Sequence, residues 1–319
     1  MRKLNDGRTL YYGKGDVFVY RTYAAPLFAE PVAESPYRGD RNVVFAHNVK
    51  FAVSGEELLS SFVDGDNALV VATDSMKNFI LRETAAYEGS TTEGLLKEIA
   101  GKFFDRYPRM TGIDIEAERL PFGRAAVKEG DGFASSELVY RRSRDERGYA
   151  KFELAKERDG EVSVVAQKSG VLGLQLIKVS GSSFYGFVRD EYTTLPESFD
   201  RPLFIFLDIR WSYADPSESL GGRTYVAPEQ VRDIAQNVFH ERVSPSIQHL
   251  LYRIGRRVLH RFPQLAEVEF ESHNRTWETV VEPGGAGEAG VYTEPRPPYG
   301  FQGFSMTRED ARNGEDESR

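Results

Sequence analysis

The chain has 319 residues, 40% of them hydrophobic, which is enough for two domains, or for one duplicated domain, with a sizeable core. It contains no cysteine, which excludes disulfides, thiolate catalysis and cysteine-bearing metal sites. The formal charge of −8 argues against a nucleic-acid ligand, because neutralising phosphates needs a clustered excess of Lys and Arg. The N-terminus lacks the apolar core of a signal peptide, and no apolar run is long enough to span a membrane, so we expect a soluble intracellular protein.

The first half of the chain reads as strands interrupted by two helices. Alternating and apolar patterns predict strands at residues 10–20, 42–53, 67–73, 113–120 and 132–141. The first helix has Asp74 or Ser75 as its predicted N-cap. The second is predicted from about Thr92 to just before Pro108, with apolar residues at helical spacing.

The second half repeats this order of elements. Its predicted strands are residues 151–155, 172–180, 203–211, 266–281 and 300–305. The predicted helices are residues 228–240 and 244–261, and the second has Ser244 at its N-cap and Pro245 at its first helical position.

The repeated order predicts an α+β fold of two antiparallel sheet-plus-helix units, residues 1–145 and 146–306, followed by a charged, disordered tail at 307–319. A sheet with helices on one face only leaves its other face uncovered. The two halves are therefore expected to close against each other, or the chains to oligomerise into a barrel.

Two sequence features argue against other kinds of site. The five histidines show no spacing typical of metal ligands, so no metal is expected. The densest basic cluster has helical spacing and is interpreted as a solvated helix face; it comprises Arg253, Arg256, Arg257 and Arg261.

Two stretches of the first half are candidates for chemistry. In YYGKGDV, Lys14 lies between two glycines after a strand, and it is either an exposed hairpin lysine or a desolvated lysine able to act as a base. The stretch lacks the spacing of a phosphate-binding Walker loop. In VVATDSMKN, Thr73 and Asp74 either cap a helix or lie where backbone N–H groups receive an anion.

The stretch SSFYGFVRDEYTTLPESFDR, residues 182–201, alternates rings and charges. It is either a half-buried strand followed by a polar turn, or a flat slot in which Phe184 stacks on a planar ligand while Arg201 binds its edge. Gln248, in the first turn of its helix, is either helix surface or a second group able to pair with that edge.

The stretch ESHNRTW places Asn274 and Thr276 two residues apart, and therefore on one face of a strand. His273 lies on the opposite face. As isolated features, all of these residues are also compatible with purely structural roles.

Taken in order, the stretches YYGKGDV, VVATDSMKN, SSFYGFVRDEYTTLPESFDR, SIQ and HNRTW resemble the urate oxidase (uricase) family, over residues 10 to 305. The resemblance implies a tunnelling fold of two antiparallel sheet-plus-helix units per chain. Four chains would assemble into a hollow β-barrel, a homotetramer with active sites at the subunit interfaces. The resemblance also implies oxidation of urate by O2 and water to 5-hydroxyisourate and H2O2, with no metal and no organic cofactor.

The resemblance assigns substrate-binding roles in the second half of the chain. Phe184 matches the ring that stacks on the purine. Arg201 and Gln248 match the pair that binds its pyrimidine edge, with the Ile247 backbone N–H as a further donor. Asn274 matches the residue that holds O2, and then water, above the substrate ring.

The remaining assignments concern proton transfer. Lys14 and Thr73 match the dyad that manages protons, and Thr73 and Asp74 are expected to reach in from the neighbouring chain. Where many family members have NKH this chain has NRT, so Thr276 replaces the histidine that usually completes the relay. Its hydroxyl can pass a proton but is no base near neutral pH, which predicts lower or pH-shifted turnover.

Two alternatives follow from this reading. The first is a catalytically weak urate- or purine-binding protein of the same fold, and the second is a tunnelling-fold enzyme of the pterin or GTP cyclohydrolase kind, whose His and Cys zinc ligands this chain lacks. The chain ends in ESR and not in a peroxisomal Ser-Lys-Leu-like signal, which favours a cytoplasmic location.

Overall fold

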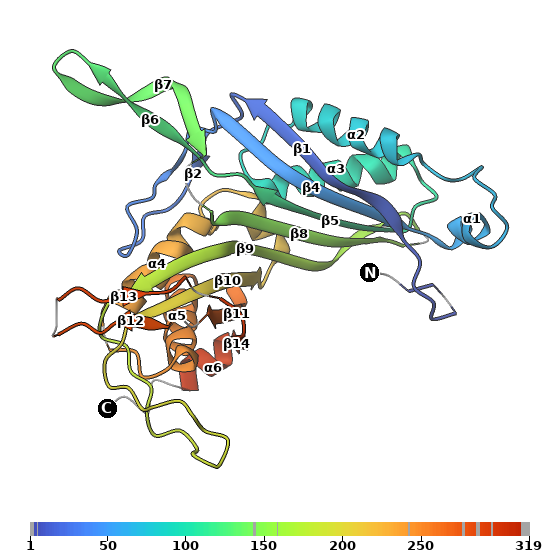
Figure 1. Ribbon diagram of the computed structural model, residues 1–319. Coiled ribbons are helices and arrows are strands. Elements are labelled where there is room, and N and C mark those ends of the chain that lie inside the picture. Colours follow the sequence, from blue (N-terminus) through green and yellow to red (C-terminus); the bar gives the residue numbers. More distant parts are fainter. Residues whose placement is uncertain are drawn as a thin grey trace. The chain divides into compact units, whose positions relative to one another are not determined.

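The computed structural model describes residues 3–4, 6–142, 145–157, 159–241, 243–275, 278–284, 288–294 and 296–313. The chain divides into two compact units, each built from strands and helices, which confirms the predicted α+β class (Figure 1). The first unit contains Met1–Pro31, Tyr37–Gly170 and Ser212–Pro228, and the second contains Val32–Pro36, Val171–Trp211 and Glu229–Arg319. The assignment of 1–145 and 146–306 to two tunnelling-fold units stays a prediction.

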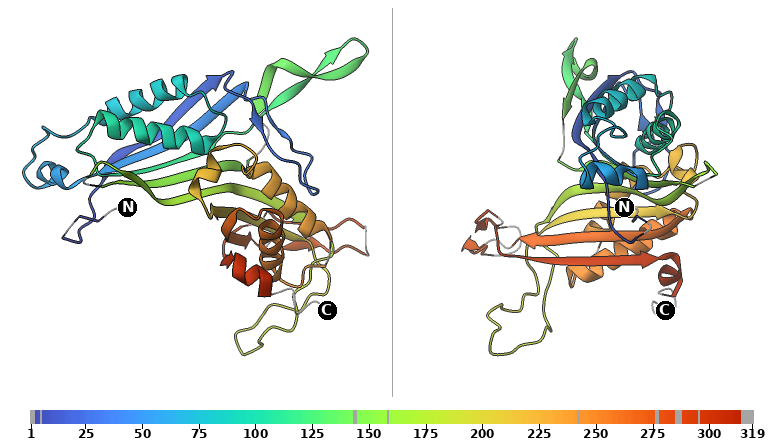
Figure 2. Two further views of the ribbon diagram at one scale, coloured as in Figure 1. Left: turned by 180° about the vertical axis from the view of Figure 1, so that it is seen from behind. Right: turned by 90° about the vertical axis from the view of Figure 1, so that its right-hand side faces the viewer.

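The first unit is a sheet with two helices packed on one face. Its neighbouring strands are, in order, β1 (Tyr12–Thr22), β4 (Val44–Ser54), β5 (Gly112–Arg119), β8 (Arg147–Lys156) and β9 (Val162–Lys178). The pairs from β1 to β8 are antiparallel. Alternate residues of β4, including Phe45, Val49 and Phe51, are buried in the core that α2 (Thr73–Ala86) and α3 (Thr92–Arg106) cover (Figure 2).

Smaller elements surround this sheet. The hairpin of β6 (Phe122–Glu129) and β7 (Gly132–Arg142) extends away from it in Figure 1. The others are β2 (Leu27–Phe28), β3 (Gly39–Asp40), the 3-10 turns η1 (Glu56–Leu58) and η2 (Pro216–Leu220), and α1 (Leu59–Val63).

The second unit repeats the arrangement of strands and helices. Its strands are the later part of β9, then β10 (Leu203–Tyr213), β11 (Leu265–Arg275) and β14 (Tyr299–Thr307), in that order. Every second residue of β10 is buried, and β11 pairs antiparallel with β14. Helices α4 (Pro228–Glu241) and α5 (Ile247–Arg261) lie on one face (Figure 2), and the short elements are β12 (Thr279–Val281), β13 (Val291–Tyr292) and α6 (Arg308–Asn313).

Three local predictions are wrong. Residues 67–73 form no strand: the Ala68 N–H donates to the Asp66 carboxylate at 2.9 Å and the Val70 N–H to the Asn67 carbonyl at 3.0 Å, which turns the chain. Helix α2 already begins at Thr73, after Ala72, without a side-chain cap. The predicted tail at 307–319 is also wrong in part, because residues 308–313 form α6; residues 314–319 lie outside the described ranges.

Helix α5 begins later than predicted. Ser246, not Ser244, is its N-cap, and the Ser246 hydroxyl accepts a hydrogen bond from the His249 N–H at 3.1 Å. The backbone of Ser244 pairs instead with residues 181–183, which shifts the helix start by two positions. Pro245, which favours Ser244 as the cap in the sequence, instead precedes the Ser246 cap in the folded chain.

A buried polar cluster lies between the sheet and α3 of the first unit. Glu93 accepts a hydrogen bond from the Ser169 hydroxyl at 2.6 Å, and burial raises the pKa of Glu93 to about 7. His47 Nε2 lies 3.0 Å from the Thr92 hydroxyl, and burial, with the nearby Arg119 charge, lowers the pKa of His47 to about 3. Both groups are therefore neutral in the folded protein near pH 6.

Replacing Glu93 by glutamine is expected to stabilise the protein at neutral pH. As the pH rises from about 4.5 to about 7, the unfolded chain releases the Glu93 proton while the folded protein keeps it, so the wild-type free energy of unfolding falls. The variant has no such proton to release, so its free energy of unfolding relative to that of wild type should rise by roughly 2–3 kcal/mol between about pH 4.5 and pH 7. Urea unfolding at pH 4.5 and 7.5 measures the gain; Glu88→Gln, at an exposed site, is the control and should gain nothing.

None of the helices in the described ranges is long and apolar enough to cross a membrane.

Candidate active site

The backbone of the 182–201 stretch holds an aromatic ring beside a guanidinium in the second unit. Phe184 and Ser198 exchange backbone hydrogen bonds of 2.7 and 2.9 Å, and the Arg201 N–H donates to the Ser182 carbonyl at 2.8 Å. These bonds close a long loop and place Arg201 Cζ 5.6 Å from the Phe184 ring centroid. Phe184 and Arg201 therefore lie side by side in the folded chain, while their roles in binding a planar ligand stay predictions.

No carboxylate of the described residues neutralises the Arg201 guanidinium. Its Nε is buried and has no hydrogen-bond partner among the described residues, and burial lowers the Arg201 pKa, although arginine stays charged. Neighbouring Asp200 does not pair with it, because its carboxylate accepts from the Gly181 N–H at 2.6 Å and the Ser180 hydroxyl at 2.8 Å. A half-buried, unpaired cation beside a ring is suited to bind the edge of an anionic planar molecule.

The N-terminus of α5 is tied to the same loop. The Ser183 N–H donates to the Ser244 carbonyl at 2.9 Å, and the Ser244 N–H donates to the Gly181 carbonyl at 3.1 Å. Ile247 and Gln248 then form the first turn of α5, where backbone N–H groups have no intrahelical acceptor. Ile247 is buried and Gln248 is exposed, so the Ile247 side chain anchors the turn while Gln248 stays available to a ligand.

Asn274 lies near the end of β11, opposite Gly300 of β14. A Cβ built on Gly300 would lie 3.1 Å from Asn274 Oδ1, so glycine leaves room for the amide. His273 lies on the other face, stacked on Phe206 with ring centroids 4.6 Å apart, and burial lowers its pKa. Strand alternation therefore separates His273 from Asn274 as predicted, while Thr276 lies outside the described residues.

Lys14 is positioned in the first unit by close packing of β1 against β4. A Cβ built on Gly13 would lie 1.9 Å from the Phe51 carbonyl oxygen, so only glycine fits there. Lys14 pairs with Phe51 of β4, and the register of the two strands shifts just after it, between Lys14 and Val17, which is a bulge in β1. Lys14 is half-buried.

The start of α2 lies close to Lys14. The Val71 N–H donates to the Tyr12 hydroxyl at 2.8 Å, which fastens β1 to the residues that lead into the helix. Thr73 is the first residue of α2 and is half-buried. The pKa of Asp74 is lowered chiefly by the hydrogen bond from Lys77, at 2.6 Å, and to a smaller extent by the charge of Lys14.

The predicted site residues thus form two groups. One loop of the second unit links Phe184, Arg201, Ile247 and Gln248. Asn274 belongs to the same unit, and the first unit contains Lys14, Thr73 and Asp74. The roles of Tyr12 and Asp200 in positioning these groups have no signal in the sequence. Among the described residues, no group of three or more His, Asp or Glu side chains is placed to hold a metal ion.

The Phe184 ring, the Arg201 guanidinium and the first turn of α5 are chemical groups suited to contact a planar, anionic heterocycle. The family model described as Uricase matches residues 167–303. The uricase of Haloferax volcanii is 51% identical over 304 residues, covering 94% of this chain and 98% of the relative. The chain belongs to the uricase family.

Two further similarities extend this finding. The uric acid degradation bifunctional protein of Bacillus sp. TB-90 is 53% identical over 307 residues, and the match covers 95% of this chain but only 61% of the relative's length. The crystal structure of a uricase from Bacillus fastidious superposes with a TM-score of 0.94 at 51% identity, and the match covers 98% of each chain.

Proposed function

We propose that the chain is a urate oxidase that converts urate, O2 and water to 5-hydroxyisourate and H2O2 without a metal or an organic cofactor. The observation that carries the proposal is the unpaired Arg201 guanidinium beside the Phe184 ring. Urate supplies what this pair lacks, namely a flat ring to stack on and an anionic edge to neutralise. The names of the relatives described above support the same substrate.

The proposed mechanism works by positioning. Phe184 supports the plane of urate, Arg201 and Gln248 bind its pyrimidine edge, and the Ile247 N–H adds a donor. Urate is electron-rich, and loss of another proton gives a dianion that can pass electrons to O2 directly. Two electrons leave urate, O2 is reduced to H2O2, and water supplies the new hydroxyl, so that binding and orientation account for most of the catalysis.

The remaining residues handle protons and oxygen. Lys14 and Thr73 remove and return protons, Asp74 supports them, and Asn274 holds O2 and then water over the ring. Thr73 and Asp74 are proposed to come from a neighbouring chain of a homotetramer, in which tunnelling-fold units close a hollow β-barrel and subunit interfaces contain the active sites. The proposed location is the cytoplasm.

The test is loss of urate absorbance measured together with O2 uptake, on metal-stripped protein without added cofactor. Matched consumption of urate and O2 would support the proposal. Tight urate binding by calorimetry without consumption would identify the chain as a catalytically weak urate-binding protein instead. Absence of both binding and turnover would overturn the assignment of the site.

Replacing Thr276 by histidine is expected to raise turnover or to move its pH optimum. An imidazole with a pKa near 6.5 accepts a proton at neutral pH, whereas a hydroxyl does not. The measurement is the pH profile of kcat for wild type, Thr276→His and the control Thr276→Ser, which keeps the hydroxyl. A histidine variant with the wild-type profile would show that this position takes no part in proton transfer.

A further inference from the structure

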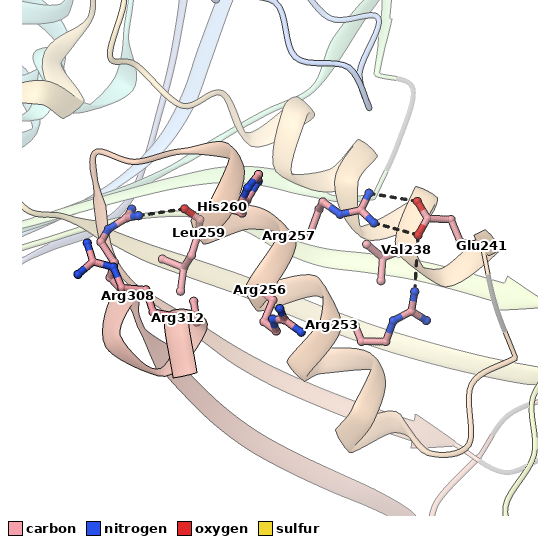
Figure 3. Close-up of a pocket in the computed structure, with 10 residues that line it drawn as sticks. Val238, Glu241, Arg253, Arg256, Arg257, Leu259, His260, Arg308 and Arg312 are labelled. Carbon is pink, nitrogen blue, oxygen red and sulfur yellow. Dashed lines mark hydrogen bonds and ion pairs between the residues drawn. The ribbon is translucent and has the colours of Figure 1, made fainter. Parts of the chain in front are cut away.

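A cavity of about 450 Å³ in the second unit is lined by α4, α5 and α6 (Figure 3). Five arginines and one carboxylate line it, a formal excess of four positive charges: Arg253, Arg256, Arg257, Arg308, Arg312 and Glu241. The volume lies within the range of about 300–1,000 Å³ typical of small-molecule sites. The spacing of the α5 arginines is typical of a helix face in contact with water, but the folded chain gathers these guanidinium groups around a concave surface.

Glu241 neutralises only part of this charge. Its carboxylate accepts from both Arg257 terminal nitrogens at 3.1 Å and lies 3.6 Å from Arg253 (Figure 3). Arg257 also contacts Glu34 at 3.3 Å. Among the described residues, Glu241 and Glu34 therefore pair only with arginines on the Arg253 and Arg257 side of the cavity.

The opposite wall has guanidinium groups that form no ion pair with a carboxylate of the described residues. Arg308 donates to the carbonyls of Leu259, Phe262 and Leu265, at the end of α5, so it contributes positive potential but few free donors. In the described part of the chain, neither Arg256 nor Arg312 forms a hydrogen bond or an ion pair.

The unpaired side chains are placed to accept a ligand. Arg256 lies over the Tyr252 ring, with Cζ 5.8 Å from the ring centroid, which fixes the side chain without neutralising it. Arg312 is exposed, and its charge, added to burial, lowers the Arg308 pKa, a sign of mutual repulsion. A bound polyanion would relieve the repulsion between Arg308 and Arg312, and it would supply hydrogen-bond acceptors to Arg256 and Arg312.

We propose that this cavity is a binding site for a small oligophosphate, a ligand with two or more linked phosphate groups. Pyrophosphate carries several negative charges that the positive excess of the wall would offset, and planar guanidinium groups bind phosphate oxygens in pairs. The site lies further along α5 than Gln248, because Arg256 is eight positions after Gln248, about 12 Å along a helix. Binding here would therefore stabilise the helix that carries part of the candidate active site.

Calorimetric titration of the full chain with pyrophosphate at about 0.1 M salt tests the proposal. Wild type should bind one pyrophosphate per chain, and the double variant Arg256→Gln/Arg312→Gln should bind at least about tenfold more weakly. Among the described residues these two side chains have no hydrogen bond or ion pair to lose, and the Arg256 contact with Tyr252 is a weak surface one, so the variant should keep its unfolding temperature to within a few degrees in the absence of ligand. ATP is titrated in parallel: tighter binding than pyrophosphate would indicate a nucleotide, and equal or weaker binding a bare oligophosphate.

Two controls locate the binding. Arg82→Gln/Lys128→Gln removes two exposed positive charges from the first unit and should change affinity less than about twofold. Arg201→Gln tests whether pyrophosphate enters the candidate active site instead, and it should leave affinity unchanged. Lack of saturable binding to wild type, equal weakening in the Arg82/Lys128 control, or loss of binding in Arg201→Gln would overturn the proposal.

Discussion

Replacing Arg201 by glutamine is expected to lower kcat/KM for urate by about 10²–10³, chiefly through a higher KM. The guanidinium is half-buried, carries an Nε without a protein partner, and lies beside the ring on which urate would stack. Glutamine keeps a donor but removes the charge and the paired geometry, so the anionic edge of urate loses its counterion. Steady-state kinetics at several urate concentrations separate the change in KM from that in kcat.

Arg189 provides a matched control. Its Cζ lies 5.7 Å from the Phe187 ring centroid, an arrangement nearly equal to that of Arg201 over Phe184, but its Nη1 donates to the Leu195 carbonyl at 3.3 Å. Arg189→Gln should change kcat/KM by less than about threefold. Equal losses in both variants would mean that the loop needs its arginines for structure, which would contradict a specific role of Arg201 in binding.

Replacing Lys14 by methionine is expected to reduce kcat by about 10²–10⁴ with little change in urate affinity. Methionine has a similar length, so it preserves packing next to the bulge of β1 while removing the group that takes up and returns protons. Lys50→Met is the control, because Lys50 lies on neighbouring β4, is 70% exposed and pairs with Glu116 at 2.9 Å. Turnover and calorimetric affinity are measured on both proteins, and equal turnover losses would argue against proton transfer by Lys14.

The two inactive variants together test whether sites are shared between chains. If Lys14 and Arg201 of one active site come from different chains, refolding a mixture of Lys14→Met and Arg201→Gln protein creates some sites with both native residues, about one in four under random assembly. Activity should then return in the mixture. A mixture that assembles but stays inactive would place both residues of each site in the same chain.

Much of the fold follows from local patterns. The helix at 92–106 and the strand β10 have regular apolar spacing, and both were predicted close to their observed limits. Burial confirms the reasoning, because every second side chain of β10 and the apolar stripe of α3 enter the core. Phe184 and Arg201 come from one stretch of mixed aromatic and charged composition, and the fold places them side by side, while their roles in binding a ligand stay predictions.

Other features depend on partners distant in sequence. Residues 67–73 have strand-like composition, yet side-chain and backbone acceptors at Asp66 and Asn67 turn the chain there. The bond between Tyr12 and Val71, which positions Lys14 near α2, joins residues 59 positions apart. Glu93 resembles an ordinary residue of the first turn of a helix, and only the folded chain shows it to be buried and hydrogen-bonded to Ser169.

The short segment Val32–Pro36 belongs to the second unit although its sequence neighbours belong to the first. Glu34 finds its partners Arg257 and Arg261 only 223 and 227 positions later, and Ser35 donates to Asp233 at 2.5 Å. During translation the segment therefore leaves the ribosome long before any of these partners exists. Contacts of such sequence separation form slowly, so we expect the second unit to complete its folding only after synthesis of α5, with the carboxylate of Glu34 in water until then.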